Sequence, residues 1–437
     1  MVFRFLIAAS ALALAAPLSA YPFQGDEPVG VPSNVEQGID FVYVDPKLKA
    51  LADQPRQSDN WMLRSVGYDW GPGWGSGQDA GQGRDSPNPI FVELRRGLDE
   101  YRMRWGSLPQ IQIPQGVTLK SRSEGERVDM LRERLGLPLG WGFDAELGDV
   151  LSDYQRVHGL EVTGIADSAT IESLNRGADH YEQLIVLNLE RARRLPLAGK
   201  FERYVLVDSG AAEVYLYDRD RVADRMRAIV GSKENRTPMM AVIMQNAKVN
   251  PYWNVPPEMI RTFTAPKVLK QGTSYLKNYH YEVLSDWSPD AVRLDPAEVD
   301  WEAVAAGGSD IRVRQKPGPW NSMGEIKFET PNDYGIYLHD TPNKALFAEA
   351  NRWISNGCVR LEDADRFASW VFGAVPEGSS AEEVVPLRRP VPVYMTYLTA
   401  VPGPDGGVQF RGDPYGFDSQ AMQRLPSSTR EIAAVGY

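Results

Sequence analysis

The 437-residue chain contains one cysteine, Cys358, in the segment WISNGCVRLED. A thiolate is a strong nucleophile, but an unperturbed thiol with a pKa near ~8.5 is mostly protonated at neutral pH. A nearby imidazole removes this limit by accepting the thiol proton. The sequence has four histidines, and His339 in GIYLHDTPNKALF stands 19 residues before the cysteine. Cys358 and His339 are therefore a candidate nucleophile and general base.

The residues beside the cysteine suit acyl transfer. Gly357 lets the backbone bend and lets a substrate carbonyl approach the main chain closely. The N–H groups of such a turn, including that of Cys358, can form an oxyanion hole. Arg360 shares a strand face with Cys358 if the segment is extended. Its guanidinium can hold the thiolate charge or a substrate carboxylate, and an ion pair with the acids of LEDAD is an equally weighted alternative.

The elements that must bring these residues together are predicted to be mostly strands. From residue 203 onward, short β-rich runs alternate with turn residues. His339 ends one such run, and helical patches are expected at 343–353 and 362–373, on either side of the cysteine. A strand end, a helical crossover and a return would place the two side chains together. We expect a multidomain α+β chain whose mostly-β domain carries the site.

The segments IYLHDTPNKALF and ISNGCVRLED resemble the catalytic signature of L,D-transpeptidases with a YkuD-type domain. Two further stretches agree with this signature, namely RAIVGSKENRTPMMAVIMQNAKVNPYWNVPPEMI and RQKPGPWNSMGEIKFETPNDYGIYLHDTP. The resemblance spans roughly 203–398. The long stretch between these blocks is similar to the larger YcbB-like subgroup, in which a mobile capping subdomain is inserted, here at about 261–320. The aromatic residues of this insertion are expected to form a small core, with a grip on a stem peptide as the alternative; they are Tyr275, Tyr279, Tyr281 and Trp287.

The resemblance implies a role for each matching residue. Cys358 matches the nucleophile and His339 the general base, and Gly357 with Cys358 matches the turn that lines the oxyanion site. Arg360 matches the arginine that follows the cysteine. Tyr337, two residues before His339, matches an active-site tyrosine. Nothing in the reaction needs a cofactor or a metal, and the histidines are too scattered for a zinc site.

One position departs from the pattern of many relatives. Asn356 stands directly before the glycine, where many relatives carry a histidine. The larger subgroup also lacks this histidine, so the departure indicates the subgroup rather than an inactive site. The third member of the catalytic set therefore stays open, and a backbone carbonyl near His339 or Asp340 is an alternative to a side chain. Asn356 is expected to contact the substrate. Trp253 and Asn254 in NPYWNVPP are expected to line the substrate groove, with a core or turn position as the alternative.

The region before the β-rich domain is predicted to be largely helical. Residues 121–176 show a three-helix pattern that resembles a peptidoglycan-binding domain; a purely structural helical subdomain is the alternative. Residues 177–202 are predicted to form a linking helix. Residues 21–120 are interpreted as an irregular lead and scaffold region with a Gly-rich segment at 67–89, and 401–437 as a C-terminal tail.

The N-terminal segment MVFRFLIAASALALAAPLSA indicates a secretory signal, residues 1–20, with an uncleaved anchor as the alternative. We therefore expect a periplasmic protein with no membrane span after cleavage. Export leaves a lone cysteine without an internal disulfide partner. The net charge of −11 argues against general nucleic-acid binding.

The combined prediction is an L,D-transpeptidase that forms 3→3 crosslinks between peptidoglycan stem peptides, with release of D-Ala from a tetrapeptide donor. Three alternatives stay open. The thioester can pass to another acceptor, namely water, a D-amino acid or a protein lysine. The chain can be a non-catalytic wall-binding scaffold, or an unrelated cysteine peptidase of the wall.

Overall fold

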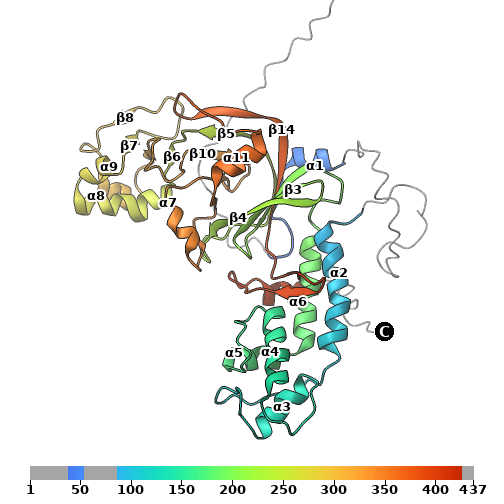
Figure 1. Cartoon of the computed structure of the whole chain (residues 1–437). Coiled ribbons are helices and arrows are strands. Elements are labelled where there is room, and N and C mark those ends of the chain that lie inside the picture. Colours follow the sequence, from blue (N-terminus) through green and yellow to red (C-terminus); the bar gives the residue numbers. More distant parts are fainter. Residues whose placement is uncertain (1–37, 54–85, 426–437) are drawn as a thin grey trace, which may run out of the picture.

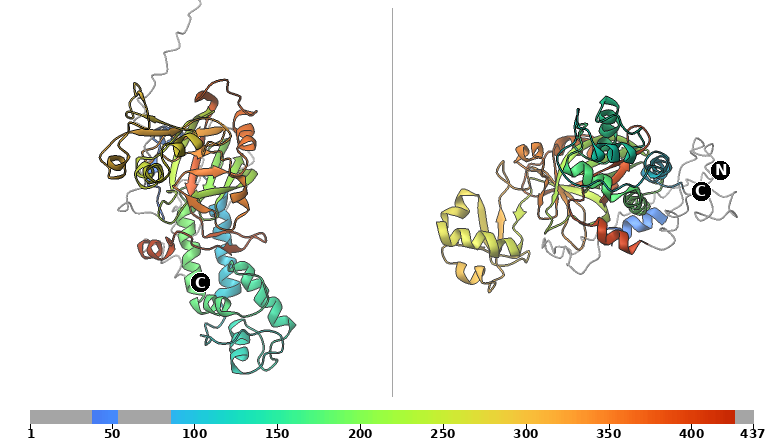
Figure 2. Two further views of the ribbon diagram at one scale, coloured as in Figure 1. Left: turned by 90° about the vertical axis from the view of Figure 1, so that its left-hand side faces the viewer. Right: turned by 90° about the horizontal axis from the view of Figure 1, so that it is seen from below.

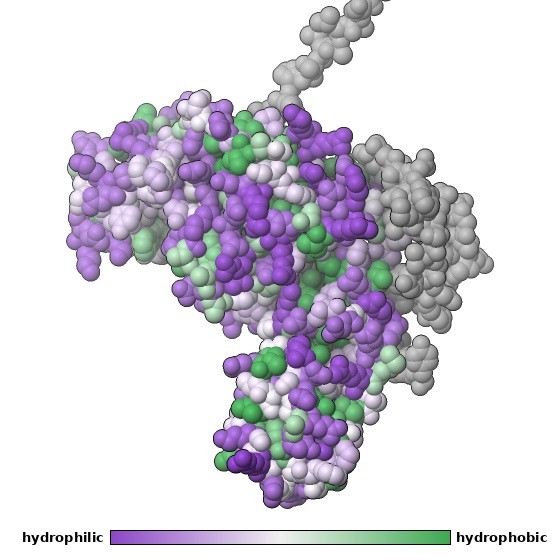
Figure 3. Space-filling view, viewed as in Figure 1, coloured by the Kyte–Doolittle hydropathy of each residue, from purple (hydrophilic) through white to green (hydrophobic). Residues whose placement is uncertain are grey.

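The computed structural model describes residues 38–53 and 86–425, which form a barrel of strands, a small cap and a helical unit (Figure 1). The expected signal segment 1–20, most of the Gly-rich segment 67–89 and the last residues of the expected tail lie outside the described residues. In the part of the chain that the structure describes, no helix is both long and apolar enough to cross a membrane. The surface in Figure 3 is mostly polar, with apolar side chains scattered among polar ones.

The barrel closes through its last long strand, β14 (Glu383–Thr396). This strand pairs with β2 (Arg203–Asp208) along one edge and with β5 (Met240–Val249) along the other. Side chains alternate between its two faces, as the pleat of a strand requires. Val205 and Val207 are fully buried inside, whereas Tyr204 and Leu206 belong to the core shared with the helices. The strands in order are β5 (Met240–Val249), β10 (Ile326–Glu329), β11 (Leu338–His339), β13 (Val359–Leu361), β4 (Arg221–Gly231), β3 (Glu213–Asp218), β2 (Arg203–Asp208) and β14 (Glu383–Thr396).

Further elements extend or fill the barrel. The helix α11 (Ala364–Phe372) places Phe367 in the barrel core, with its ring 4.7 Å from that of Phe328. The predicted helix over 362–373 is thus confirmed. The pairing elements are β1 (Tyr43–Val44) on β5 and β12 (Trp353–Ser355) on β4, and α1 (Pro46–Asp53) follows β1. This ordered start corrects the interpretation of the first part of 21–120 as an irregular lead, since Leu48 of α1 is buried in the core.

Two long helices lie side by side and join the barrel to the helical unit (Figures 1 and 2). Phe91, Leu94, Leu98 and Tyr101 recur at helical spacing in the sequence, and all four are buried on one face of α2. Side-chain caps begin α2, α4 and α5, where Asn88, Asp144 and Asp167 accept hydrogen bonds from backbone N–H groups. The helices are α2 (Pro89–Tyr101), its continuation η2 (Arg102–Gly106), α3 (Glu126–Arg134), α4 (Ala145–Val157), α5 (Ser168–Arg176) and α6 (Ala178–Ala192).

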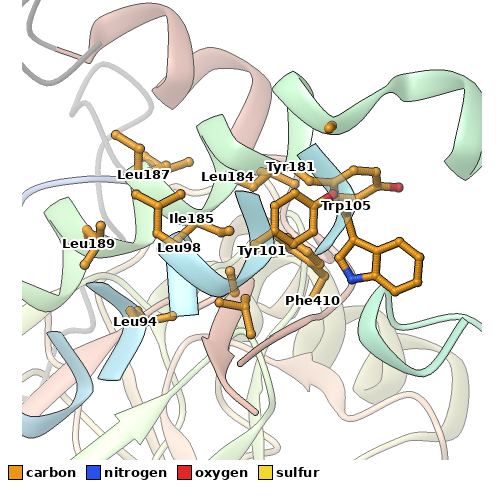
Figure 4. Close-up of a cluster of buried hydrophobic side chains, with 14 of the residues drawn as sticks. Leu94, Leu98, Tyr101, Trp105, Tyr181, Leu184, Ile185, Leu187, Leu189 and Phe410 are labelled. Atoms are coloured by element: carbon orange, nitrogen blue, oxygen red, sulfur yellow. The ribbon is translucent and has the colours of Figure 1, made fainter. Parts of the chain in front are cut away.

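The described part of 401–437 is not a tail. Residues beyond the barrel form a hairpin of β15 (Ala400–Pro402) and β16 (Val408–Phe410), followed by α12 (Asp418–Arg424). Phe410 packs among aromatic side chains of α2 and α6, with ring-centre distances of 5.5 Å to Tyr101 and 4.8 Å to Tyr181 (Figure 4). The assignment to a tail was wrong because the apolar residues of this hairpin are buried by helices far away in the sequence, a contact that a single sequence does not specify.

Buried polar contacts also tie the ends of the described chain to α6. The guanidinium of Arg191, which is fully buried, donates a hydrogen bond of 2.7 Å to the carbonyl of Gly38 and pairs with Asp418 at 2.8 Å. It also donates to the hydroxyl of Thr399 at 3.2 Å. The polar network of Arg191 therefore connects α6 with Gly38 at the start of the described chain and with α12 at its end.

The cap has its own sheet and core, and Figure 2 shows it projecting from the barrel. Its strands begin at Trp253, earlier than the expected insertion at about 261–320. Tyr275 is buried in the cap core and Tyr281 and Trp287 pack against it, which confirms a small aromatic core for these three, whereas Tyr279 is 53% exposed and does not join it. The elements are β6 (Trp253–Asn254), β9 (Arg312–Gln315), β7 (Tyr281–Leu284) and β8 (Arg293–Leu294), with α7 (Pro257–Met259), η3 (Ile260–Thr264), α8 (Ala265–Gln271), α9 (Ser274–Asn278) and α10 (Trp301–Ala305).

Candidate active site

Two short parallel strands place the backbone at Cys358 beside the segment that carries His339. His339 of β11 is in register with Arg360 of β13, and the N–H of Val359 donates to the carbonyl of Tyr337 at 3.0 Å. Cys358 directly precedes β13, so it lies beside the segment that leads into His339. The connecting chain contains the 3₁₀ helix η4 (Lys344–Ala348) and the strand β12, where a helical patch over 343–353 was expected.

The imidazole of His339 is held by the main chain. The side chain is 2% exposed, and its Nδ1 lies 2.5 Å from the carbonyl oxygen of Asp340. A carbonyl can only accept, so in the neutral ring Nδ1 carries the hydrogen and Nε2 is the basic nitrogen. The carboxylate of Asp340 is engaged elsewhere, since it accepts from Lys344 at 2.6 Å and from the N–H of Glu325 at 3.0 Å.

The electrostatic surroundings keep the imidazole neutral. Burial lowers the pKa of His339 to about 3, and the positive charges of Arg360 and Lys327 act in the same direction. Hydrogen bonds from the ring to the carbonyls of Asp340 and Met323 oppose the shift. These carbonyls would stabilise an imidazolium once the ring accepts a proton.

The thiol of Cys358 is also neutral at rest. Burial raises its pKa, and hydrogen bonds from the backbone and side chain of Tyr337, together with the charges of Lys327 and Arg360, act against that increase. The sulfur lies 3.6 Å from the carbonyl of Gly335. Several groups therefore favour the thiolate, while the low polarity of the site favours the thiol.

The turn at the cysteine is fixed on both sides. Gly357 has a φ of 110°, and a Cβ there would lie 2.9 Å from Cδ1 of Ile336. Thr237 donates through its hydroxyl to the carbonyl of Gly357 at 2.6 Å. The hydroxyl of Ser355 accepts from the Gly357 N–H at 3.2 Å and donates to the carbonyl of Cys358 at 2.7 Å. The backbone of the cysteine is thus positioned independently of its side chain.

Arg360 does not form the ion pair that the sequence offered as an alternative. Glu362 pairs with Arg227 and Asp363 pairs with Arg366. The Nε of Arg360 is buried and has no hydrogen-bond partner among the described residues. Burial lowers the pKa of its guanidinium, and the nearby Cys358 acts in the opposite direction. The site therefore holds a guanidinium that no described carboxylate neutralises.

Asn356 links the cysteine turn to the cap. Its Nδ2 lies 2.8 Å from the sulfur of Met259 in α7, and its Oδ1 accepts from Asn235 at 3.3 Å. The side chain is exposed, so it is open to a substrate at the boundary between barrel and cap.

Trp253 and Asn254 both lie in strand β6 of the cap. Trp253 packs against the cap core with its ring 6.2 Å from that of Tyr281. The Oδ1 of Asn254 accepts a hydrogen bond of 2.8 Å from Arg312. These contacts give both residues a structural role inside the cap, and their expected contact with substrate stays a prediction.

Sequence reasoning missed Lys327. It is in register with His339 on the neighbouring strand, and its Nζ lies 4.0 Å from the ring centre of Tyr337. Tyr337 in turn packs edge-on against His339 with ring centres 5.7 Å apart. A lysine that alternates with apolar residues in a strand usually faces solvent. The segment EIKFE therefore did not indicate that Lys327 lies near the reactive pair.

Metal chemistry was not expected from the sequence. Within residues 38–53 and 86–425, no three His, Cys, Asp or Glu side chains gather in a way that could hold a metal ion.

Comparison with known proteins identifies two regions of the chain. Residues 202–393 match the YkuD family, described as "L,D-transpeptidase catalytic domain", and residues 142–174 match a "Putative peptidoglycan binding domain". A Haemophilus influenzae protein described as "Putative L,D-transpeptidase" is 32% identical over 247 residues, which are 54% of this chain and 48% of that protein. The aligned part therefore spans about half the length of this relative.

Solved structures of L,D-transpeptidases are also similar to part of the chain. The enzyme from Mycobacterium smegmatis is 16% identical with a TM-score of 0.23, over 44% of this chain and 58% of that one. L,D-transpeptidase 3 from Mycobacterium tuberculosis is 12% identical with a TM-score of 0.22, over 44% of this chain and 60% of that one.

Proposed function

We propose that the chain is a cysteine acyltransferase that crosslinks stem peptides of peptidoglycan. Its residues 202–393 match an L,D-transpeptidase catalytic domain, and a second segment matches a peptidoglycan-binding domain. The observation that carries the proposal is the imidazole of His339, whose Nδ1 bonds the Asp340 carbonyl on the strand next to Cys358. This contact fixes the tautomer that can accept the thiol proton. The cap that contacts the cysteine turn supports membership of the YcbB-like subgroup.

The first half-reaction transfers the donor to the enzyme. Nε2 of His339 removes the proton of Cys358 as the sulfur attacks the carbonyl carbon at the L-centre of the third residue of a tetrapeptide stem. The bond between this carbon and the nitrogen of the terminal D-Ala then breaks. The imidazolium returns its proton to the departing amine, and a thioester with the enzyme remains.

The second half-reaction passes the acyl group to an amine of a neighbouring stem. The amine attacks the thioester carbon and gives its proton to His339, while the sulfur leaves as a thiolate and is then reprotonated by the imidazolium. A new amide bond, the 3→3 crosslink, replaces the peptide bond to D-Ala. Neither half-reaction consumes an oxidant, a reductant or a nucleotide.

Two groups can stabilise the charge that develops. The Gly357 N–H already donates to Ser355, so the Cys358 N–H is the amide of this turn that we assign to the oxyanion. Arg360 can take the carboxylate of the terminal D-Ala, which lies close to the bond that breaks, or the charge of the thiolate. Either partner would supply the negative charge that the buried guanidinium lacks among described residues.

The helical unit is proposed to hold the enzyme on the polymer, which places the protein outside the cytoplasm. The acceptor is the least constrained part of the proposal. Water in place of the amine would give a tripeptide, and a D-amino acid or a protein lysine would give exchange or anchoring.

The test is incubation of the mature protein with disaccharide-tetrapeptide, followed by mass spectrometry. We expect a dimer that lacks one D-Ala, and no dimer with Cys358→Ala or His339→Ala. Tripeptide monomer as the sole product would assign a hydrolase. Full crosslinking activity of Cys358→Ala in cells would assign a non-catalytic scaffold.

A further inference from the structure

We propose that Lys327 is a positioning residue of the reactive centre. Its ammonium group is anchored by Glu329, holds Tyr337 against Cys358 and supplies positive charge that favours the thiolate. The inference rests on Cys358 being the nucleophile of the proposed function, and it is independent of which acceptor completes the reaction.

Strand register places this lysine in the site. Lys327 on β10 is opposite His339 on β11, and His339 is opposite Arg360 on β13. Side chains opposite each other in adjacent strands share a face of the sheet. The flanking Ile326 and Phe328 lie in the barrel core, so Lys327, His339 and Arg360 form a row on the outer face.

The burial of Lys327 is unusual for a surface strand position, because only 5% of the residue is exposed. Burial of an ammonium group is costly unless the charge is paired. Glu329 provides the pair, with its Oε1 at 3.2 Å from the lysine Nζ. Because Glu329 is itself buried, this pair fixes the position of the ammonium group rather than leaving it to solvent.

The aromatic ring of Tyr337 is the second contact. The Nζ of Lys327 lies 4.0 Å from the ring centre, a distance at which a cation is attracted to the π face. Backbone and side-chain groups of Tyr337 hydrogen-bond the sulfur of Cys358 and lower the pKa of its thiol. The charge of Lys327 lowers that pKa further. The contacts thus run from Glu329 through Lys327 and Tyr337 to the nucleophile.

A neighbouring lysine separates this role from simple neutralisation of Glu329. Lys248 on β5 is opposite Lys327 in the sheet, and its Nζ lies 3.7 Å from the same Oε1 of Glu329. Lys248 also pairs with Glu382 at 3.7 Å. Glu329 would therefore keep a cationic partner without Lys327, whereas the contact with Tyr337 would be lost.

The experiment measures alkylation of the full chain by iodoacetamide across pH 5–10, read by intact mass, because Cys358 is the only thiol. Lys327→Met keeps the length of the side chain and removes its charge. We expect its rate at pH 7 to fall about tenfold, which corresponds to a thiol pKa about one unit higher. Lys327→Arg should restore most of the loss. Lys248→Met, the matched control, should follow the wild-type profile.

The proposal is overturned if Lys327→Met, folded by circular dichroism, gives the wild-type pH profile, or if Lys248→Met shifts the profile equally. Should Lys327→Met fail to fold, Lys327→Gln repeats the measurement with a neutral polar side chain; a profile unchanged from wild type would then overturn the proposal, and an upward shift would support it. Alkylation needs no stem peptide. Absence of crosslinking by the wild type would therefore count against the proposed function while leaving this inference testable.

Discussion

At the scale of the residue, the reactive pair is expected to rest as a neutral thiol and a neutral imidazole. The pKa of His339 is lowered to about 3 and that of Cys358 is raised, both chiefly by burial. A preformed thiolate–imidazolium pair is therefore disfavoured, and proton transfer should accompany attack on the substrate.

This protonation state predicts the pH dependence of the first half-reaction. A base with a pKa lowered to about 3 is already neutral at pH 5, so the rate of thioester formation should show no inflection for His339 between pH 5 and 8. The rate should increase toward alkaline pH, since the raised thiol pKa moves thiolate formation upward. The resemblance to the family implies that a carbapenem acylates Cys358. The rate of this acylation at each pH can be measured by rapid-quench mass spectrometry. An acid limb centred near pH 6.5 would contradict the neutral pair.

Arg360 predicts a preference for anionic reagents. Iodoacetate carries a carboxylate that iodoacetamide lacks, so an unneutralised guanidinium beside Cys358 should favour iodoacetate. In Arg360→Gln the ratio of the two alkylation rates should fall several-fold. Arg227→Gln is the control, because Arg227 already pairs with Glu362. An equal ratio in wild type and Arg360→Gln would restrict Arg360 to a structural role.

The sequence was informative about the pair itself and less so about its surroundings. Cys358 and His339 could be singled out because thiol chemistry needs both groups and the chain offers few of either. The orienting carbonyl of Asp340 has no signature, since every residue carries a carbonyl. Lys327 was missed because its importance depends on strand register with His339, which a single sequence does not specify.

At the scale of the element, strong local periodicity was the reliable signal. The helix predicted over 362–373 is α11, and the linking helix predicted over 177–202 is α6. The strands β11 and β16 have only two and three residues, and their sequences do not specify which strands they pair with. Their positions are determined by partners that are distant in the chain, such as β13 for β11.

The end of α4 carries a buried histidine with a purely structural environment. Nδ1 of His158 donates to the carbonyl of Tyr154 at 2.7 Å, which leaves Nε2 to accept from the hydroxyl of Tyr101 at 3.1 Å. Its ring stacks on Tyr154 and Phe410. Burial lowers the pKa of His158 to about 3.

His158 therefore predicts loss of stability in acid. The unfolded histidine, with a pKa near ~6.5, binds a proton that the folded state resists, so its contribution is complete above pH 6.5 and is lost as pH falls toward 3. His158→Phe should cost about 1–3 kcal/mol at pH 7, because the hydroxyl of Tyr101 loses its acceptor. Urea unfolding at pH 7 and pH 4.5 should show this deficit shrinking in acid. A constant deficit would contradict a neutral buried imidazole.

At the scale of the whole molecule, the helical unit lies at one end of α2 and α6 and the barrel at the other (Figure 1). Binding to the polymer and chemistry on a stem peptide should therefore be separable. The helical unit exposes Trp141, which is 72% accessible and directly precedes the segment that matches the peptidoglycan-binding family. Such an indole offers a flat apolar face to a polymer.

Trp141→Ala should weaken sedimentation of the protein with insoluble peptidoglycan several-fold, while its turnover of soluble disaccharide-tetrapeptide stays unchanged. Met103→Ala is the control, because Met103 is equally exposed at 72% but lies on η2, outside the matched segment. Equal loss of sedimentation in both variants, or in neither, would assign wall contact to another surface.

The hairpin of β15 and β16 and the network of Arg191 carry a consequence for biosynthesis. Residues 89–192 leave the ribosome long before residue 410, yet the rings of Tyr101 and Tyr181 pack against Phe410. Arg191 likewise waits for Asp418. The nascent helices of 89–192 must therefore remain incompletely packed while the barrel is translated. Their packing is completed by β15, β16 and α12, which are synthesised after the barrel strands.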